Sequence, residues 1–202
     1  MSVHVTAQTK QAINPVIHAD VPDMAMIRVG NNYYMSSTTM HMSPGVPIMK
    51  STDLVNWKLI GYAYDTLVSN DEMNLVNGKS TYGRGSWASS IRYHQGTYYV
   101  STFAATSGKT HVYSTKNIEK GPWKHQSFQP SLHDHSLFFD DDGKVYMLYG
   151  NHKIILVELN DDSPVIIIEG DEYPESKIHL KSKFLFYHPN ICLFSGIAWD
   201  HF

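Results

Sequence analysis

Two stretches of this chain repeat each other in the same order and at nearly the same spacing. The segment IRVGNNYYMSST (Ile27–Thr38) resembles IRYHQGTYYVST (Ile91–Thr102), which begins 64 residues later. Farther along, KSTDLVNWK (Lys50–Lys58) resembles YSTKNIEKGPWK (Tyr113–Lys124), and their shared Ser-Thr pairs are 63 residues apart. A repeat of this length is typical of architectures in which one supersecondary unit stacks on its neighbours.

Each repeat begins with two short runs of β-forming residues around a polar turn, which predicts a β-hairpin. The predicted strand pairs are Met26–Val29 with Tyr33–Thr38, Ser90–Tyr93 with Thr97–Phe103, and Leu137–Phe139 with Val145–Tyr149. The third pair is followed by the apolar strand Ile154–Leu159, and a weak fourth copy begins at Lys177–Tyr187. Units of four short antiparallel strands are the blades of a β-propeller, so we expect an all-β fold with three to four blades.

That number of blades is low for a closed ring, which typically needs four to eight. Residues Asn160–Ser176 are acidic and irregular, and the sequence beyond Pro189 matches no earlier blade. We therefore expect one partial propeller domain over residues 1–202, either a fragment or a chain that diverges near its end.

Composition narrows the classes of function. A net charge of −3 and a pI near 6.4 give no basic surface for nucleic acid, and no apolar run approaches the roughly 20 residues of a membrane span. The single cysteine, Cys192, excludes an internal disulfide. Aromatic residues make up 12% of the chain, which suits packing between sheets or stacking on the apolar face of a sugar ring. Trp57 and Trp123 occupy equivalent repeat positions, which favours a packing role for both.

Acidic residues stand just before the innermost strands of two predicted blades. Asp20 and Asp23 precede the first hairpin, and Asp134 precedes the third. Inner strands line the axis of a propeller, so these side chains are expected to meet there, although a turn or capping role is the plain alternative for each one. Two carboxylates that face one cavity suit glycosidic bond hydrolysis, with one as general base and the other as general acid.

Two other clusters suggest metals less strongly. His133 and His135 flank Asp134 with a spacing that could suit zinc, but no third ligand is evident, and a hydrogen-bonding role is favoured. The acidic run Asp140–Asp142 lacks the spacing of a calcium loop and is expected to be a hairpin turn.

At this level the chain resembles glycoside hydrolase family 43, from about Asn14 to about Leu159. The first blade, NPVIHADVPDMAMIRVGNNYYMSSTTMHMSPGVPIMKSTDLVNWK, resembles the opening of that family. RGSWASSIRYHQGTYYVST and SLHDHSLFFDDDGKVYMLYG resemble its second and third blades, in the version of α-L-arabinofuranosidases and β-xylosidases. The resemblance implies a five-bladed propeller and an exo-acting, inverting glycosidase.

The family's catalytic residues can be transferred to three positions. By this resemblance Asp23 matches the family's general base, because it stands five residues before Arg28. Met24 replaces the usual proline, and Asp20 lies nearby. Asp134 matches the family's aspartate that orients the general acid and raises its pKa. By this resemblance Glu175 matches the family's general acid, and Glu172 is the alternative. Both lie in a stretch that lacks the family's glycine.

The resemblance also implies residues that bind the sugar. They lie in the loops of the first three blades: Trp87, Met40, His41, His133, Arg84 and Phe103. It implies no cofactor and no catalytic metal, and it allows a structural calcium in the axial channel. The implied partners are arabinoxylan, arabinan or xylo-oligosaccharides, with no nucleic acid or membrane.

The alternative is a carbohydrate-binding or vestigial propeller that lacks a competent general acid. The incomplete ring predicts little or no turnover by residues 1–202 alone, and its open blade edges predict self-association. The resemblance implies a secreted or periplasmic protein, whereas the absence of an apolar signal-peptide core in Met1–Ile13 leaves a cytoplasmic location open.

Overall fold

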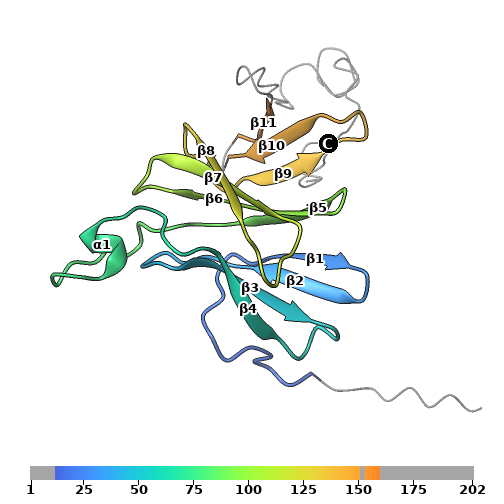
Figure 1. Cartoon of the computed structure of the whole chain (residues 1–202), viewed down its shortest axis with the longest axis horizontal. Coiled ribbons are helices and arrows are strands. Elements are labelled where there is room, and N and C mark those ends of the chain that lie inside the picture. Colours follow the sequence, from blue (N-terminus) through green and yellow to red (C-terminus); the bar gives the residue numbers. More distant parts are fainter. Residues whose placement is uncertain (1–11, 151–152, 160–202) are drawn as a thin grey trace, which may run out of the picture.

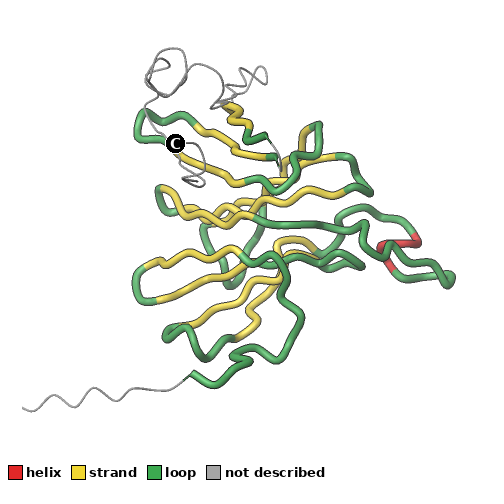
Figure 2. The backbone as a smooth tube through the Cα atoms, turned by 180° about the vertical axis from the view of Figure 1, so that it is seen from behind, coloured by secondary structure: helices red, strands yellow, loops and turns green. Residues whose placement is uncertain are grey.

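A computed structural model of the chain describes residues 12–150 and 153–159. Within these residues the chain forms three antiparallel sheets that follow one another along the sequence (Figure 1). Strands make up nearly all of the regular structure, as Figure 2 shows from behind. The predicted all-β class and its three recognisable blades are confirmed, and the predicted fourth copy at 177–187 lies outside the described residues.

The first two sheets are complete four-stranded blades with strands in simple sequence order. Both hairpins lie within two residues of their predicted bounds, and Gly30 in the first turn and Gln95 and Gly96 in the second adopt positive φ angles, as tight hairpin turns require. The first blade consists of β1 (Ala25–Val29), β2 (Asn32–Ser36), β3 (Gly45–Ser51) and β4 (Lys58–Tyr64). The second consists of β5 (Ser90–His94), β6 (Thr97–Ala104), β7 (Lys109–Thr115) and β8 (Lys124–Phe128).

The third sheet has three strands among the described residues. They are β9 (Ser136–Phe139), β10 (Val145–Tyr149) and β11 (Ile155–Leu159), in the order β11-β10-β9. The innermost strands of successive blades are neighbours, since β5 packs against both β1 and β9. The beginnings of all three inner strands therefore belong to one region of the molecule.

The second repeated motif turns out to be a side-chain-capped turn between the third and fourth strands. Asp53 accepts hydrogen bonds from the backbone N–H groups two and three residues ahead, at 3.0 and 2.8 Å, and Asn117 does the same at 3.2 and 3.1 Å. The hydroxyls of Ser51 and Thr115 each accept a bond from the N–H two residues ahead, at 3.1 Å. Local side-chain bonding of this kind explains why the motif occurs in both of the first two blades.

The hydrophobic cores lie between blades. One cluster combines Ile48 of β3 with Ile91 of β5 and Val100 of β6, all of which are 0% exposed. A second cluster joins the third blade, through Leu137 and Met147, to residues of the second blade that include Val112. The apolar faces described are thus buried between adjacent blades, with the second blade packed against both the first and the third.

The one helix in the described part of the chain is short and was missed by sequence reasoning. Helix α1 (Asp71–Asn74) lies in the long connection between β4 and β5. Asn70 caps it by accepting a hydrogen bond from the Met73 N–H at 2.8 Å, and two acidic residues occupy its first turn. No helix in residues 12–150 and 153–159 has the length and apolar character needed to cross a bilayer.

Shared cores make a stability prediction. Truncation of Ile91 to alanine removes a fully buried side chain from the contact between the first two blades. We expect Ile91→Ala to lower the free energy of unfolding by about 2–5 kcal/mol. Leu59→Ala, on β4 where Leu59 is 44% exposed, is the matched control and should cost under about 1 kcal/mol. Urea titrations followed by circular dichroism measure both, and equal losses would contradict a core shared between blades.

Candidate functional site

Side-chain hydroxyls join the beginnings of the three inner strands. Ser36 pairs with Ala25 at the start of β1, and the Ser89 hydroxyl, just ahead of β5, donates to the Ser36 hydroxyl at 2.9 Å. The Ser90 hydroxyl at the start of β5 accepts a bond of 3.1 Å from the Leu137 N–H in β9. This hydroxyl seam (Ser36, Ser89 and Ser90) places the segments that precede β1, β5 and β9 side by side.

Asp23 and Asp134 occupy equivalent positions in these segments. Each stands two residues before the inner strand of its blade, and each side chain is exposed. Their φ angles are 49° and 48°, in the left-handed region that non-glycine residues rarely adopt. Such strained residues cluster at functional sites, where the surrounding structure holds them in place.

The same backbone hydrogen bond holds both aspartate loops. The carbonyl just before Asp23 accepts a bond of 3.2 Å from Thr38 N, which follows β2. The carbonyl just before Asp134 accepts a bond of 3.0 Å from Gly150 N, which follows β10. Both residues therefore precede inner strands, as predicted. Their shared backbone geometry could not be predicted from the sequence. Asp20, the alternative to Asp23, is exposed and lacks the left-handed backbone.

Three rings form an aromatic wall (Trp87, Phe103 and His133) beside Asp134. The ring of His133 lies 6.0 Å from that of Trp87 and 5.2 Å from that of Phe103. His133 Nδ1 is 3.2 Å from Asp134 Oδ2. Trp87 is half-buried and His133 half-exposed, whereas Phe103 is only 6% exposed. Trp87 and His133 can therefore contact a ligand, and Phe103 supports them from behind.

The peptide of Gly83 connects His41 to Trp87. Its N–H donates to His41 Nδ1 at 2.9 Å, and its carbonyl accepts from Trp87 Nε1 at 3.0 Å. His41 also stacks on the exposed ring of Tyr82 at 4.2 Å, a contact that no sequence pattern indicated. The loop after β2 is thus brought to the edge of the aromatic wall.

The other two sugar-binding candidates lie in the same pair of loops. The carbonyl of Met40 accepts a bond of 2.8 Å from Gly85 N, where a Cβ would meet the Thr39 carbonyl oxygen at 2.6 Å, so this close approach requires glycine. Arg84 is exposed, and its carbonyl accepts a backbone bond from Thr106. The six residues predicted to bind sugar therefore lie in segments that contact one another, and His133 among them contacts Asp134.

His135 anchors the loop that carries Asp134. It is 4% exposed, its Nδ1 lies 2.9 Å from the Leu132 carbonyl, and its Nε2 lies 2.8 Å from the Ser101 hydroxyl. A carbonyl can only accept, so Nδ1 carries the proton and Nε2 accepts from Ser101. Burial lowers the pKa of His135, which keeps the ring neutral in this role. Both nitrogens are occupied, so the His133–His135 pair does not form the zinc site considered from its spacing.

The predicted general acid, Glu175, and its alternative, Glu172, lie outside the described residues. Within the described ranges no group of three or more His, Cys, Asp or Glu side chains is placed to hold a metal ion. The acidic run Asp140–Asp142 forms the β9–β10 hairpin turn, in which Asp142 accepts a bond of 2.9 Å from Lys144 N. The described part thus presents two exposed carboxylates just ahead of inner strands, and an aromatic wall lies beside one of them, Asp134, which suits binding of a neutral polyol.

Buried neutral histidines predict how stability depends on pH. Burial lowers the pKa of His135, and it lowers that of His111 to about 4, while unfolded histidine titrates near 6.5. The unfolded chain therefore binds more protons than the folded chain once the pH falls below about 6.5, so the free energy of unfolding decreases as the pH falls further. We expect His135→Gln to weaken this decrease, as measured by denaturant titrations between pH 7.5 and 5.5. An unchanged slope would contradict a buried, neutral His135.

Known proteins with the same blades are glycosidases. The chain is 39% identical over 143 residues to a "Beta-xylosidase" of Formosa agariphila, which covers 67% of this chain and 23% of that protein. It is 34% identical over 148 residues to a "Non-reducing end alpha-L-arabinofuranosidase" of Bacteroides ovatus, with 72% and 27% covered. The chain thus spans about a quarter of the length of these curated relatives.

Solved structures agree in fold. A "Bifunctional GH43-CE" protein of Bacteroides eggerthii superposes with a TM-score of 0.68 at 68% identity, over 75% of this chain and 21% of that chain. The "GH43 BlXynB protein" of Bacillus licheniformis gives a TM-score of 0.63 at 32% identity, over 79% and 34%. These neighbours are five-bladed propellers, which confirms the expected fold class.

The family model matches most of the chain. The description "Glycosyl hydrolases family 43" fits residues 12–177, a range that includes all three blades and both aspartates. The resemblance seen in the blade motifs is therefore confirmed, and the chain belongs to glycosyl hydrolase family 43.

Proposed function

We propose that the exposed carboxylates at the starts of β1 and β9 belong to a glycosidase site that releases xylose or arabinose from plant polysaccharides. The observation that carries the proposal is the equivalence of Asp23 and Asp134. Both have the same left-handed backbone and the same supporting hydrogen bond, the hydroxyl seam joins their strands through β5, and the aromatic wall lies beside Asp134. The names of the relatives support pentose sugars as the substrate class.

In this proposal Asp23 is the general base. Its exposed carboxylate removes a proton from a water molecule as that water attacks the anomeric carbon, which gives inversion of configuration. Inverting glycosidases hold the base and acid carboxyl groups about 6.5–9.5 Å apart, which leaves room for this water. Glu175 is proposed as the acid that protonates the leaving oxygen.

Asp134 is proposed as the residue that orients the acid and raises its pKa by like-charge repulsion. Its loop is held by the buried His135, whose Nδ1 donates to the Leu132 carbonyl at 2.9 Å and whose Nε2 accepts from the Ser101 hydroxyl at 2.8 Å. The carbonyl of His133 in turn accepts a hydrogen bond from the N–H of Gly150, which follows β10. These contacts supply the rigid support that a carboxylate needs in order to act on one atom of a bound substrate.

Trp87, His133 and His41 are proposed to hold the sugar. The half-buried indole of Trp87 offers a flat apolar surface to the C–H face of a pentose ring. His133 and His41 supply polar edges next to it, and the Gly83 peptide fixes the distance between His41 and Trp87. The net charge of −3 is consistent with a neutral sugar in place of a polyanion.

The role of Asp23 is tested by comparing two neighbouring aspartates. We expect Asp23→Asn to lower kcat by a factor of roughly 10² or more, because amide nitrogen cannot accept the proton from water. Asp20→Asn is the matched control, since Asp20 is also exposed but precedes β1 by five residues and lacks the left-handed backbone. Fluorogenic β-xylosides and α-L-arabinofuranosides record the ratios even where absolute turnover is low. Wild-type rates in Asp23→Asn, or equal losses in both variants, would remove the base from this position.

The aromatic wall makes a separate prediction for binding. Replacement of Trp87 by alanine removes the exposed stacking surface, so KM for aryl xylosides should rise about tenfold. Trp87→Phe keeps an aromatic face and should recover most of that loss. Steady-state kinetics of both variants decide the point, and a KM for Trp87→Ala equal to that of the unchanged protein would show that the sugar binds elsewhere.

A further inference from the structure

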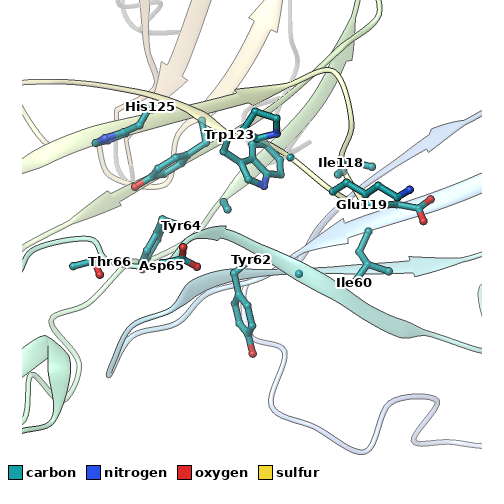
Figure 3. Close-up of a pocket in the computed structure, with 15 residues that line it drawn as sticks. Ile60, Tyr62, Tyr64, Asp65, Thr66, Ile118, Glu119, Trp123 and His125 are labelled. Atoms are coloured by element: carbon teal, nitrogen blue, oxygen red, sulfur yellow. The ribbon is translucent and has the colours of Figure 1, made fainter.

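A groove lies at the outer edge of the molecule, away from the starts of the inner strands. It runs between β4, the outermost strand of the first blade, and the connection from β7 to β8 in the second blade, and it encloses about 510 Å³ (Figure 3). That volume is within the range of small-molecule sites in proteins. Nothing in the proposed catalytic role requires this space.

Gly61 lies at the floor of the groove, which is open there because glycine has no side chain. Gly61 pairs with Ile48 across the β3–β4 ladder, so a side chain at 61 would point to the same face as Ile48, toward the second blade. A Cβ built on Gly61 meets no atom within 4 Å. Tyr62, the next residue, points to the opposite side of the strand in Figure 3. The groove therefore exists because the residue that would fill it is a glycine.

Aromatic rings form the opposite wall. Trp123 packs against the core cluster with part of its surface and lines the groove with the rest. Beside it, the exposed ring of His125 stacks on buried Tyr113 with 4.7 Å between ring centres and 13° between planes. Figure 3 shows Trp123 between His125 on one side and Ile118 on the other. A flat, partly apolar ligand can thus lie over Gly61 with its face on the indole.

The charged groups of the groove are balanced, because the cation Lys120 lines it together with two carboxylates. Asp65 is exposed next to Tyr64 at one end, and Glu119 lies at the other end, paired with Lys50 at 2.6 Å. Because Lys50 neutralises Glu119 and Lys120 offsets Asp65, the groove has no excess charge that would attract an anion or a cation, and its carboxylates can accept hydrogen bonds from hydroxyl groups. Aromatic faces with carboxylates at either end match a neutral ring compound rich in hydroxyls.

We propose that this groove is a second saccharide site, which holds a xylan-type chain over Gly61 and against Trp123. The choice of a pentose chain rests on the proposed function, whereas the preference for a neutral saccharide follows from the groove itself. The site binds the polymer without cleaving it. It keeps the polysaccharide on the protein while chain ends are processed at the starts of the inner strands.

The test is a calorimetric titration of linear xylohexaose into Asp23→Asn protein, in which the oligosaccharide stays intact. Adding Gly61→Leu fills the groove from a position with ordinary backbone angles and open space, so it should fold normally. We expect the loss of one class of binding site, or a fall in affinity of about tenfold or more. Trp57→Ala is the matched control, because Trp57 holds the equivalent repeat position outside the groove, and it should leave binding unchanged.

The proposed hydrolysis and the proposed groove binding can be tested independently of each other. Gly61→Leu alone should leave kcat/KM on small aryl xylosides unchanged while weakening xylohexaose binding. Equal xylohexaose affinity with and without Gly61→Leu would overturn the second site, whatever Asp23→Asn does. Cleavage of xylohexaose by Asp23→Asn at the wild-type rate would instead overturn the proposed catalytic base and leave the groove intact. Tighter binding of cellohexaose than of xylohexaose at Gly61 would contradict the pentose assignment.

Discussion

The structure depends on apolar faces that only a neighbouring blade can cover. Ile48 and Ile91 belong to different blades, yet both are fully buried in one cluster, and Leu137 and Met147 of the third blade need residues of the second. Burial of this kind is the main favourable term in folding, so each sheet is stable only in its stack. The stack in turn fixes where every inner strand begins, which gives the site its geometry.

The candidate site lies at the inner edge of the stacked blades, where the inner strands begin. The hydroxyl seam of Ser36, Ser89 and Ser90 joins the inner strands with small polar side chains that let the backbones approach closely. Asp23 and Asp134 lie outside the strands, just ahead of β1 and β9, where the backbone can adopt left-handed angles. The chemistry thus lies where regular structure starts, and the groove over Gly61 lies at the opposite, outer edge.

Much of this could be predicted from local patterns, and the rest depended on contacts across the fold. Hairpins and the position of Asp134 follow from turn residues and from the repeat, because both are encoded within a few residues. The bond between His135 and Ser101 joins residues 34 positions apart, and the bond between Gly83 and His41 joins residues 42 positions apart. Helix α1 escaped because one turn gives no periodicity, although Asn70 before two acidic residues was a usable capping signal.

The most direct test of the account is the position of a sugar bound to the protein. A crystal structure of the Asp23→Asn variant soaked with xylobiose should show a pentose ring against Trp87 and His133. Its scissile oxygen should lie on the side of Asp134, and a water should lie within about 3 Å of the side chain at position 23. A sugar bound away from both aspartates, with the aromatic wall empty at saturating xylobiose, would contradict the assignment of the catalytic centre to the starts of the inner strands.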